Sequence, residues 1–221
     1  MRKHKVMSKH ILFDLDGTLT DSSSGIINSI QFALNKMGVQ EDDQKKLRAF
    51  VGPSLLSTFK NNYFSEEADQ KQAIKYYREY FSTEGIYENS LYKDVIEMLD
   101  TIKEHNYKIA LATAKPTYFA NIILAHFNID DYFDVVVGSH LTGTRTDKKD
   151  IIHEVKDQFG LPHPDTCTMI GDREYDILGG KHHQMNTIGV SYGYAKENEM
   201  QIVNPDHIVH CPLEISNIIC S

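Results

Sequence analysis

The sequence predicts an α/β fold, in which a mostly parallel sheet is flanked by helices and an all-helical segment is inserted after the first strand. Two observations lead to this prediction. Short apolar runs alternate with helical patterns along most of the 221 residues, which is typical of βαβ units. The alternation fails once, between Gly17 and about Tyr92, where helical spacing continues without a convincing strand.

The predicted strands are short apolar runs, most of which are bounded by Gly, Asp or Asn. They cover residues 10–13, 108–112, 134–137, 166–170 and 187–190, with a weaker run at 207–209. Because helical patterns separate these runs, the strands are expected to pair in a mostly parallel sheet.

The inserted segment has apolar residues at helical spacing over 26–37, 55–59 and 73–81. Ser22 or Ser23 can cap the start of the first helix. No internal repeat or low-complexity run interrupts the sequence of this segment. The pattern therefore predicts a helical subdomain of at least three helices.

The connections between the two parts are short, as a lid requires. We expect residues 1–19 and 88–221 to form the α/β core and residues 20–87 to form the helical cap. Gly85 is a candidate hinge in the second connection, because glycine tolerates large backbone changes.

The chain is acidic, with a formal net charge of −8 and a pI of about 5.7. An acidic surface disfavours a nucleic-acid polymer or an anionic membrane as a partner. It is compatible with an anionic small molecule, because a bound metal ion can reverse the local charge. We therefore expect a small-molecule ligand, whereas the sequence leaves both a monomer and a homodimer open.

The cysteines, Cys167, Cys211 and Cys220, are odd in number and form no C-x-x-C pair. We therefore expect neither a disulfide framework nor a zinc site, and a reducing cytoplasm suits such a chain. No apolar run reaches the length of a membrane span, and no signal-peptide pattern follows the basic first residues. A cytoplasmic location is expected, with translation starting at Met1 or Met7.

The first polar locus, Asp-Leu-Asp-Gly-Thr at residues 14–18, directly follows the first predicted strand. In an extended chain Asp14 and Asp16 project to the same side, and adjacent carboxylates repel unless a cation or proton intervenes. Mg²⁺ is the natural cation for such oxygen ligands. Gly17 permits a sharp turn, and the N–H groups of Gly17 and Thr18 can bind an anion. The alternative is a strand-ending turn with two solvated aspartates.

Two further loci also follow predicted strands. Thr113 ends an apolar strand before a helix, where its hydroxyl can bind a phosphate oxygen or merely cap that helix. Lys148 opens a helix, which is unfavourable for the helix dipole unless the charge bridges Asp14 and a phosphoryl oxygen. Lys149 is the neighbouring candidate, and a solvated basic turn is the alternative interpretation.

The fourth locus is the pair Asp172 and Asp176. Asp172 ends an apolar strand and Asp176 lies one helical turn further on, so both carboxylates can face one point. Ligands of open α/β sheets bind outside the carboxyl ends of the strands. The four loci are therefore expected to meet in one crevice.

Taken in order, the four loci resemble the four motifs of the haloacid dehalogenase-like hydrolase superfamily. Residues 14–18 look like the first motif, Thr113 like the second, Lys148 like the third, and the G-D-x-x-x-D string at 171–176 like the fourth. The inserted helices lie between the first and second motifs, as in the subgroup with an α-helical cap. The resemblance covers essentially the whole chain and implies a Rossmann-like catalytic core.

This resemblance implies Mg²⁺-dependent hydrolysis of a small phosphomonoester. Asp14 would be the nucleophile that becomes an aspartyl phosphate, and Asp16 would act as general acid and then as general base. The Asp14 carboxylate, the Asp16 backbone carbonyl and Asp172 would bind Mg²⁺. Asp176 would be a water-mediated ligand or would support the other ligands.

The phosphoryl group would be held by Thr113, by the backbone N–H of Ala114 and by Lys148. A cap that closes over the site would contact the leaving group. Candidate cap contacts are Arg48, Ser54 and Lys60, for which surface charge or polarity is the alternative interpretation.

Residues 50–53, 77–81 and 112–116 look most like the 5′-nucleotidase-like branch, while a phosphoglycolate phosphatase-like activity stays open. A phosphotransferase such as a sugar phosphomutase would use the same Asp nucleophile with a sugar hydroxyl as acceptor. A phospho-accepting signalling domain is a remote alternative. Asp16 argues against it, because an acid/base group next to Asp14 promotes loss of the phosphoryl group. The inserted helices argue against it as well.

Overall fold

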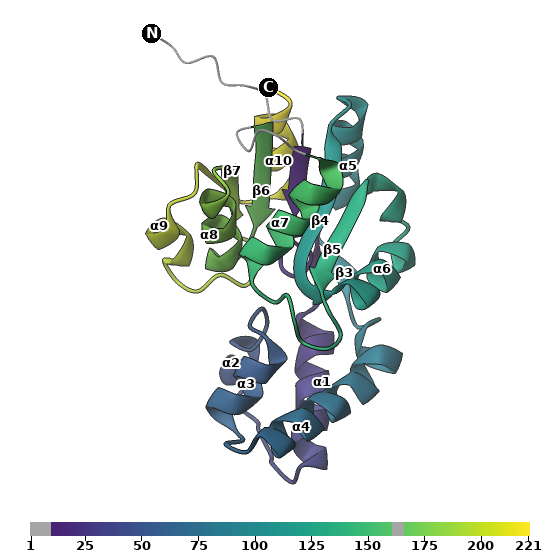
Figure 1. Ribbon diagram of the computed structural model, residues 1–221, viewed down its shortest axis with the longest axis vertical. Coiled ribbons are helices and arrows are strands. Elements are labelled where there is room, and N and C mark those ends of the chain that lie inside the picture. The colour runs from purple at the N-terminus through teal and green to yellow at the C-terminus, as the bar shows by residue number, and fades with distance from the viewer. Residues whose placement is uncertain (1–9, 161–165) are drawn as a thin grey trace. The chain divides into compact units, whose positions relative to one another are not determined.

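The computed structural model describes residues 10–160 and 166–221 (Figure 1). The chain divides into two compact units: one runs up to Leu19 and continues over Leu91–Ser221, and the other is Thr20–Ser90. The contacts place the second boundary after Ser90, three residues beyond the boundary expected from the sequence. Within the described residues, none of the helices combines the length and the apolar character that a membrane span requires.

The larger unit is built on a six-stranded sheet in which every pair of neighbouring strands is parallel (Figure 1). In spatial order the strands are β5 (Val135–Ser139), β4 (Lys108–Pro116), β1 (His10–Phe13), β6 (Cys167–Gly171), β7 (Asn186–Val190) and β8 (His207–Val209). The six predicted strands are thus confirmed. Because β4, β1 and β6 are adjacent, the segments that follow their carboxyl ends lie at one edge of the sheet.

Helices follow the strands of this unit. They are α5 (Val95–Glu104), α6 (Thr117–His126), the 3₁₀ helix η2 (Asp130–Tyr132), α7 (Lys148–Phe159), α8 (Glu174–His182), α9 (Glu199–Val203) and α10 (Pro212–Ile219). Buried side chains of the sheet, among them Leu12 and Met169, pack in one cluster with Ile151 and Val155 of α7. Full burial of each such side chain contributes roughly 1.5–3 kcal/mol, so this core holds α7 against the sheet.

The smaller unit is mainly helical, as predicted. It contains α1 (Ser23–Lys36), α2 (Gln44–Arg48), α3 (Leu55–Asn62), α4 (Glu67–Tyr80) and the π-helix η1 (Phe81–Gly85). Helix α1 packs against α4. Ring stacking of Tyr77 on Phe81, with centroids 5.4 Å apart, lies inside this unit and joins α4 to η1.

One local feature of this region differs from the sequence expectation. The two-residue strands β2 (Thr20–Asp21) and β3 (Ser90–Leu91) pair with each other, where the sequence predicted only helices and connections. Two residues are too few to produce a detectable alternation of polar and apolar side chains, so no sequence period could have revealed this pair.

Candidate active site

Four predicted loci converge at the carboxyl ends of the strands. Asp14 follows β1, Asp172 follows β6, and Lys148 is the first residue of α7. Thr113 is different, because it lies within β4, where the register against β5 shifts between Ala112 and Pro116. The sheet order therefore brings together side chains that are more than a hundred residues apart in the sequence.

Lys148 is the centre of this arrangement. Its Nζ lies 2.9 Å from Oδ1 of Asp14 and 2.7 Å from Oδ1 of Asp176, and it donates a hydrogen bond to the Ala112 carbonyl at 2.9 Å. Burial by itself would lower the pKa of Lys148, but the charges of Asp14 and Asp176 raise it above its usual value. Lys148 is therefore cationic at neutral pH.

Lys149 occupies a different environment. Its backbone N–H donates to Oδ1 of Asp147 at 2.9 Å, which caps α7, and the residue is exposed. Of the two lysines that the sequence left as candidates, only Lys148 is buried against the acidic groups. The dipole cost of a lysine at a helix start is thus offset by two carboxylates.

Three buried carboxylates gather beside Lys148. One oxygen from each of Asp14, Asp172 and Asp176 lies within 4.8 Å of the others. Burial, followed by the charges of Asp176 and Asp14, raises the pKa of Asp172 well above its usual range. Burial, opposed by Lys148, likewise raises the pKa of Asp176. The anionic forms of Asp172 and Asp176 are therefore disfavoured unless a further positive charge is bound.

The same cluster fits a hard divalent cation. Asp172 is fully buried, and its Oδ1 has no hydrogen-bond donor within the described part of the chain. Its other oxygen, Oδ2, accepts a hydrogen bond from the backbone N–H of Tyr194 at 2.6 Å. A fixed carboxylate with one oxygen left for a ligand, surrounded by further carboxylates, is a suitable donor set for Mg²⁺.

Asp16 is directed to another partner. Its Oδ2 lies 3.1 Å from Nζ of Lys115, whose side chain is buried. The sequence assigned Asp16 to the metal through its backbone carbonyl, and the cluster of side-chain carboxylates is formed by Asp14, Asp172 and Asp176. Because the Asp16 side chain pairs with Lys115, the group of Asp16 that would bind a metal is its backbone carbonyl. Lys115 was missed as a site residue, although its place two residues after Thr113 was a usable signal.

The turn after β1 is compact. Gly17 has φ +85°, and a Cβ added there would lie 2.2 Å from Oδ2 of Asp172, so no other residue fits. The N–H of Thr18 donates to the Leu15 carbonyl at 3.2 Å, which corrects the expectation that it is available to an anion. The Thr18 carbonyl in turn accepts a hydrogen bond from the hydroxyl of Tyr192 at 3.0 Å.

The structure excludes one of the two interpretations of Thr113, the helix cap. Helix α6 begins at Thr117 with Pro116 in the capping position, so Thr113 is not its cap. The buried Thr113 hydroxyl instead accepts a hydrogen bond from the backbone N–H of Lys115 at 3.2 Å. Ala114, between them, is exposed. Thr113 and Ala114 thus occupy the irregular stretch of β4, where a strand can turn its groups toward a ligand.

A segment after β7 also belongs to the site and was not identified from the sequence. Tyr192 and Tyr194 donate the hydrogen bonds to Thr18 and Asp172 described above. Between them, a Cβ added at Gly193 would lie 2.3 Å from the Gly17 carbonyl oxygen and 2.4 Å from Cβ of Asp172. This close approach explains the glycine between two tyrosines. The available signal was a glycine just past the end of an apolar strand.

The candidate cap contacts lie in the smaller unit. The hydroxyl of Ser54 accepts a hydrogen bond from the backbone N–H of Ser57 at 3.2 Å and so caps α3. Arg48 and Lys60 are both exposed on that unit. Ser54 therefore has a local structural role that accounts for its presence.

Comparisons with known proteins identify a family and several relatives. Residues 11–190 match the model of a family described as haloacid dehalogenase-like hydrolase. A relative from Pseudomonas aeruginosa, named 5′-nucleotidase, is 41% identical over 207 residues, which cover 94% of this chain and 93% of the relative. A relative from Mycobacterium tuberculosis, named tyrosine-protein kinase PtkA, is 32% identical over 200 residues, which cover 90% of this chain and 68% of the relative. The crystal structure of a predicted phosphatase from Clostridium acetobutylicum matches with a TM-score of 0.91 at 38% identity, covering 97% of this chain and 99% of that one.

Proposed function

The chain belongs to the haloacid dehalogenase-like hydrolase family and is a phosphoric monoester hydrolase, and we propose that it cleaves a small phosphomonoester with Mg²⁺ through an aspartyl phosphate on Asp14. One observation supports this proposal above all others. The buried ammonium of Lys148 lies within 3 Å of the Asp14 carboxylate and beside two further buried carboxylates. Such a site has charge of both signs in reach of one phosphoryl group.

The metal would be held by the carboxylates of Asp14 and Asp172 and by the Asp16 backbone carbonyl, with Asp176 acting through water. When bound there, Mg²⁺ reduces the repulsion between the nucleophile and the phosphate and stabilises charge on the phosphoryl oxygens. Asp172 is already oriented for this role by the Tyr194 N–H.

In the first step an Asp14 oxygen forms a bond to phosphorus, while the bond from phosphorus to the leaving oxygen breaks. Asp16 donates the proton that the leaving oxygen needs. Lys148 and the Thr113 hydroxyl hold phosphoryl oxygens as charge moves from the phosphate to the leaving group.

In the second step Asp16 takes a proton from water, whose oxygen bonds to phosphorus as the bond to Asp14 breaks. This returns the Asp14 carboxylate and releases inorganic phosphate. Asp16 enters the first step protonated and becomes a carboxylate when it gives up that proton, so it is in the form that the second step requires of a base. The Lys115 ammonium, 3.1 Å from its Oδ2, is the ion-pair partner of that carboxylate.

A count of formal charges supports the assignment. With Asp16 protonated, as the first step requires, the carboxylates of Asp14, Asp172 and Asp176 carry −3, while Mg²⁺, Lys115 and Lys148 together supply +4. The site is then close to neutral, so a phosphate anion can enter without strong net repulsion.

For the substrate we propose a nucleoside 5′-monophosphate. This class is supported by the name of the relative from Pseudomonas aeruginosa, which matches nearly the full length of the chain. Phosphate release should be measured over a panel containing nucleoside 5′-monophosphates, phosphoglycolate and sugar phosphates, with Mg²⁺ and with EDTA. Turnover is expected with Mg²⁺ only and fastest for a nucleotide. No release from any member would reject the proposal, and a preference for phosphoglycolate would move it to that substrate.

A phosphotransferase is the second candidate, because a relative that matches most of the chain is named as a kinase. Such an enzyme would pass the phosphoryl group from Asp14 to an acceptor hydroxyl instead of water. The same panel separates the two functions when each reaction is run with and without an added sugar or tyrosine-containing peptide. Transfer to the acceptor at the expense of inorganic phosphate would favour the phosphotransferase.

A further inference from the structure

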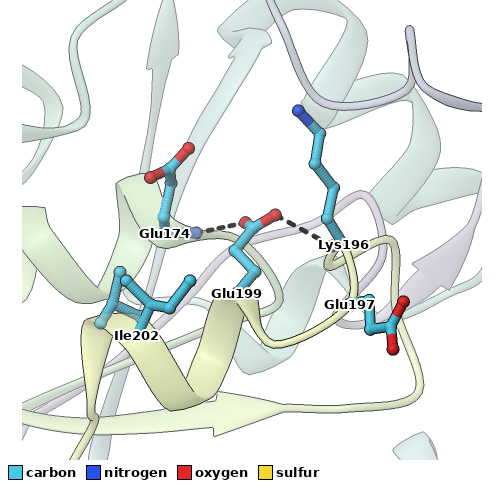
Figure 2. Close-up of a pocket in the computed structure, with 6 residues that line it drawn as sticks. Glu174, Lys196, Glu197, Glu199 and Ile202 are labelled. Carbon is cyan, nitrogen blue, oxygen red and sulfur yellow. Dashed lines mark hydrogen bonds between the residues drawn. The ribbon is translucent and has the colours of Figure 1, made fainter.

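Glu199, the first residue of α9, is a buried carboxylate outside the acidic cluster. Its Oε1 accepts hydrogen bonds from Nε of Arg173 at 2.9 Å and from the backbone N–H of Glu174 at 2.7 Å. Its Oε2 accepts from the backbone N–H of Lys196 at 2.9 Å (Figure 2). Glu199 thus binds two segments that are more than twenty residues apart in sequence.

Burial of such a group is costly unless its charge is matched. Arg173 is also buried, and the two side chains form an ion pair. Burial tends to raise the pKa of Glu199, but Arg173 and the two backbone N–H groups lower it below its usual value. The carboxylate is therefore charged at neutral pH and holds its three donors through charge-assisted hydrogen bonds.

The first bound segment separates two of the candidate metal carboxylates. Arg173 and Glu174 stand between Asp172 and Asp176, and the Arg173 N–H donates to Oδ2 of Asp176 at 3.0 Å. A shift of this turn would therefore move Asp176 directly, and Asp172 through the chain.

The second segment bound by Glu199, at Lys196, adjoins the residue that orients the other carboxylate, Asp172. Lys196 lies two residues after Tyr194, whose N–H holds Oδ2 of Asp172. Glu199 consequently joins the turn that orients Asp176 to the strand-end segment that orients Asp172. Both attachments lie within the larger unit.

We propose that Glu199 is a positioning residue for the metal site, which fixes Asp172 and Asp176 at the separation that Mg²⁺ needs. This inference rests on the proposed function. Mg²⁺ demands near-ideal octahedral geometry with short bonds to oxygen, so small displacements of its ligands are costly. Residues that orient metal ligands typically change metal affinity by 10–100-fold when they are replaced.

The test compares Glu199→Gln with Glu197→Gln in the full chain. Glu197 and Glu199 both line a pocket of about 190 Å³ (Figure 2). Glu197, however, is exposed, and its carboxylate points away from Glu199. Mg²⁺ affinity is measured by isothermal titration calorimetry without substrate, and circular dichroism reports folding. Glu199→Gln is expected to bind Mg²⁺ about 10–100-fold more weakly, whereas kcat at saturating Mg²⁺ changes much less. Glu197→Gln should match the wild type.

A second variant, Glu199→Asp, keeps the charge but is one methylene too short to reach all three donors. It is also expected to lose Mg²⁺ affinity. Wild-type affinity in either folded variant would overturn the proposal, and so would a failure of both variants to fold, because Glu199 would then serve the fold alone. The metal site itself is tested separately: wild-type protein that binds no Mg²⁺, or Asp172→Asn protein that binds it normally, would reject the proposed function.

Discussion

The ammonium nitrogen of Lys148 lies 2.9 Å from Oδ1 of Asp14, and both side chains are largely buried. Screening by solvent and salt is weak at such a depth, so the pair orients the carboxylate that we propose as the nucleophile. Asp14 is held from one side by Lys148 and faces the other carboxylates of the cluster. This relationship leads to the first two predictions.

Replacing Lys148 by Met should lower kcat by about 10²–10³-fold, because one fixed donor to the developing phosphoryl charge is lost. Steady-state phosphate release at saturating Mg²⁺ measures this effect. Lys149→Met is the matched control, since its side chain is exposed at the next position, and its kcat should equal that of the wild type. Equal losses in both variants would contradict the role given to Lys148.

Asp14→Asn should reduce kcat by at least about 10⁴-fold, because an amide cannot form the acyl phosphate. The fold should be retained, and melting in EDTA should occur at the same temperature or higher. The reason is that the charge of Asp14 raises the pKa values of both Asp172 and Asp176. Intact mass must exclude deamidation back to Asp, after which normal steady-state turnover would refute the nucleophile assignment.

Mg²⁺ should stabilise the protein more at pH 7.5 than at pH 5. Carboxyl groups whose pKa is raised by folding, as for Asp172 and Asp176, favour the folded state below their unfolded pKa of about 4. This stabilisation is lost as the pH rises through the folded pKa values, because both buried groups then ionise. A bound cation offsets that loss. At 100-fold excess over Kd the melting temperature should rise by roughly 5–10 °C at pH 7.5.

Differential scanning fluorimetry with Mg²⁺ and with EDTA at the two pH values checks this prediction. Asp172→Asn is the control variant and should lose most of the Mg²⁺-dependent shift. A shift of the same size at pH 5 and pH 7.5 would show that these carboxylates do not couple metal binding to protons.

Asp134 provides a test of the fold remote from the metal chemistry. It contacts Lys103 at 3.0 Å and Lys108 at 2.6 Å, and it accepts a hydrogen bond from the Ile109 N–H at 2.9 Å. Burial tends to raise the pKa of Asp134, but these partners lower it to about 2. Asp134→Asn should therefore lower the free energy of unfolding by about 1 kcal/mol at pH 7, a modest value because the lysines are partly exposed.

The pH dependence of this difference has a definite sign. A depressed pKa contributes stability above the unfolded pKa of about 4, and that contribution is lost as the pH falls toward 2. Urea unfolding of the wild type and Asp134→Asn should thus converge between pH 4 and pH 2. Asp131→Asn, an exposed neighbour, serves as the control and should follow the wild type throughout.

Much of the fold was predictable because burial leaves a local pattern in the sequence. Each strand of the sheet is an apolar run, and the first strand, β1, was predicted with its observed bounds. The convergence of Asp14, Lys148, Asp172 and Asp176 could also be anticipated, because parallel strands present their carboxyl ends at one edge. Residue type and position relative to a strand were sufficient for these inferences.

The sequence by itself determined the architecture and the kinds of groups at the site, and the tertiary structure decided which of them are partners. The pairing of Asp16 with Lys115, the hydrogen bond from Tyr194 to Asp172 and the anchoring of Arg173 by Glu199 have no periodic signal. They depend on β7 lying next to β6 and on β4 lying next to β1, which places the segments after these strands side by side. Periodicity encodes which face of an element is buried, whereas a specific contact between distant residues exists only once the sheet order brings them within bonding distance.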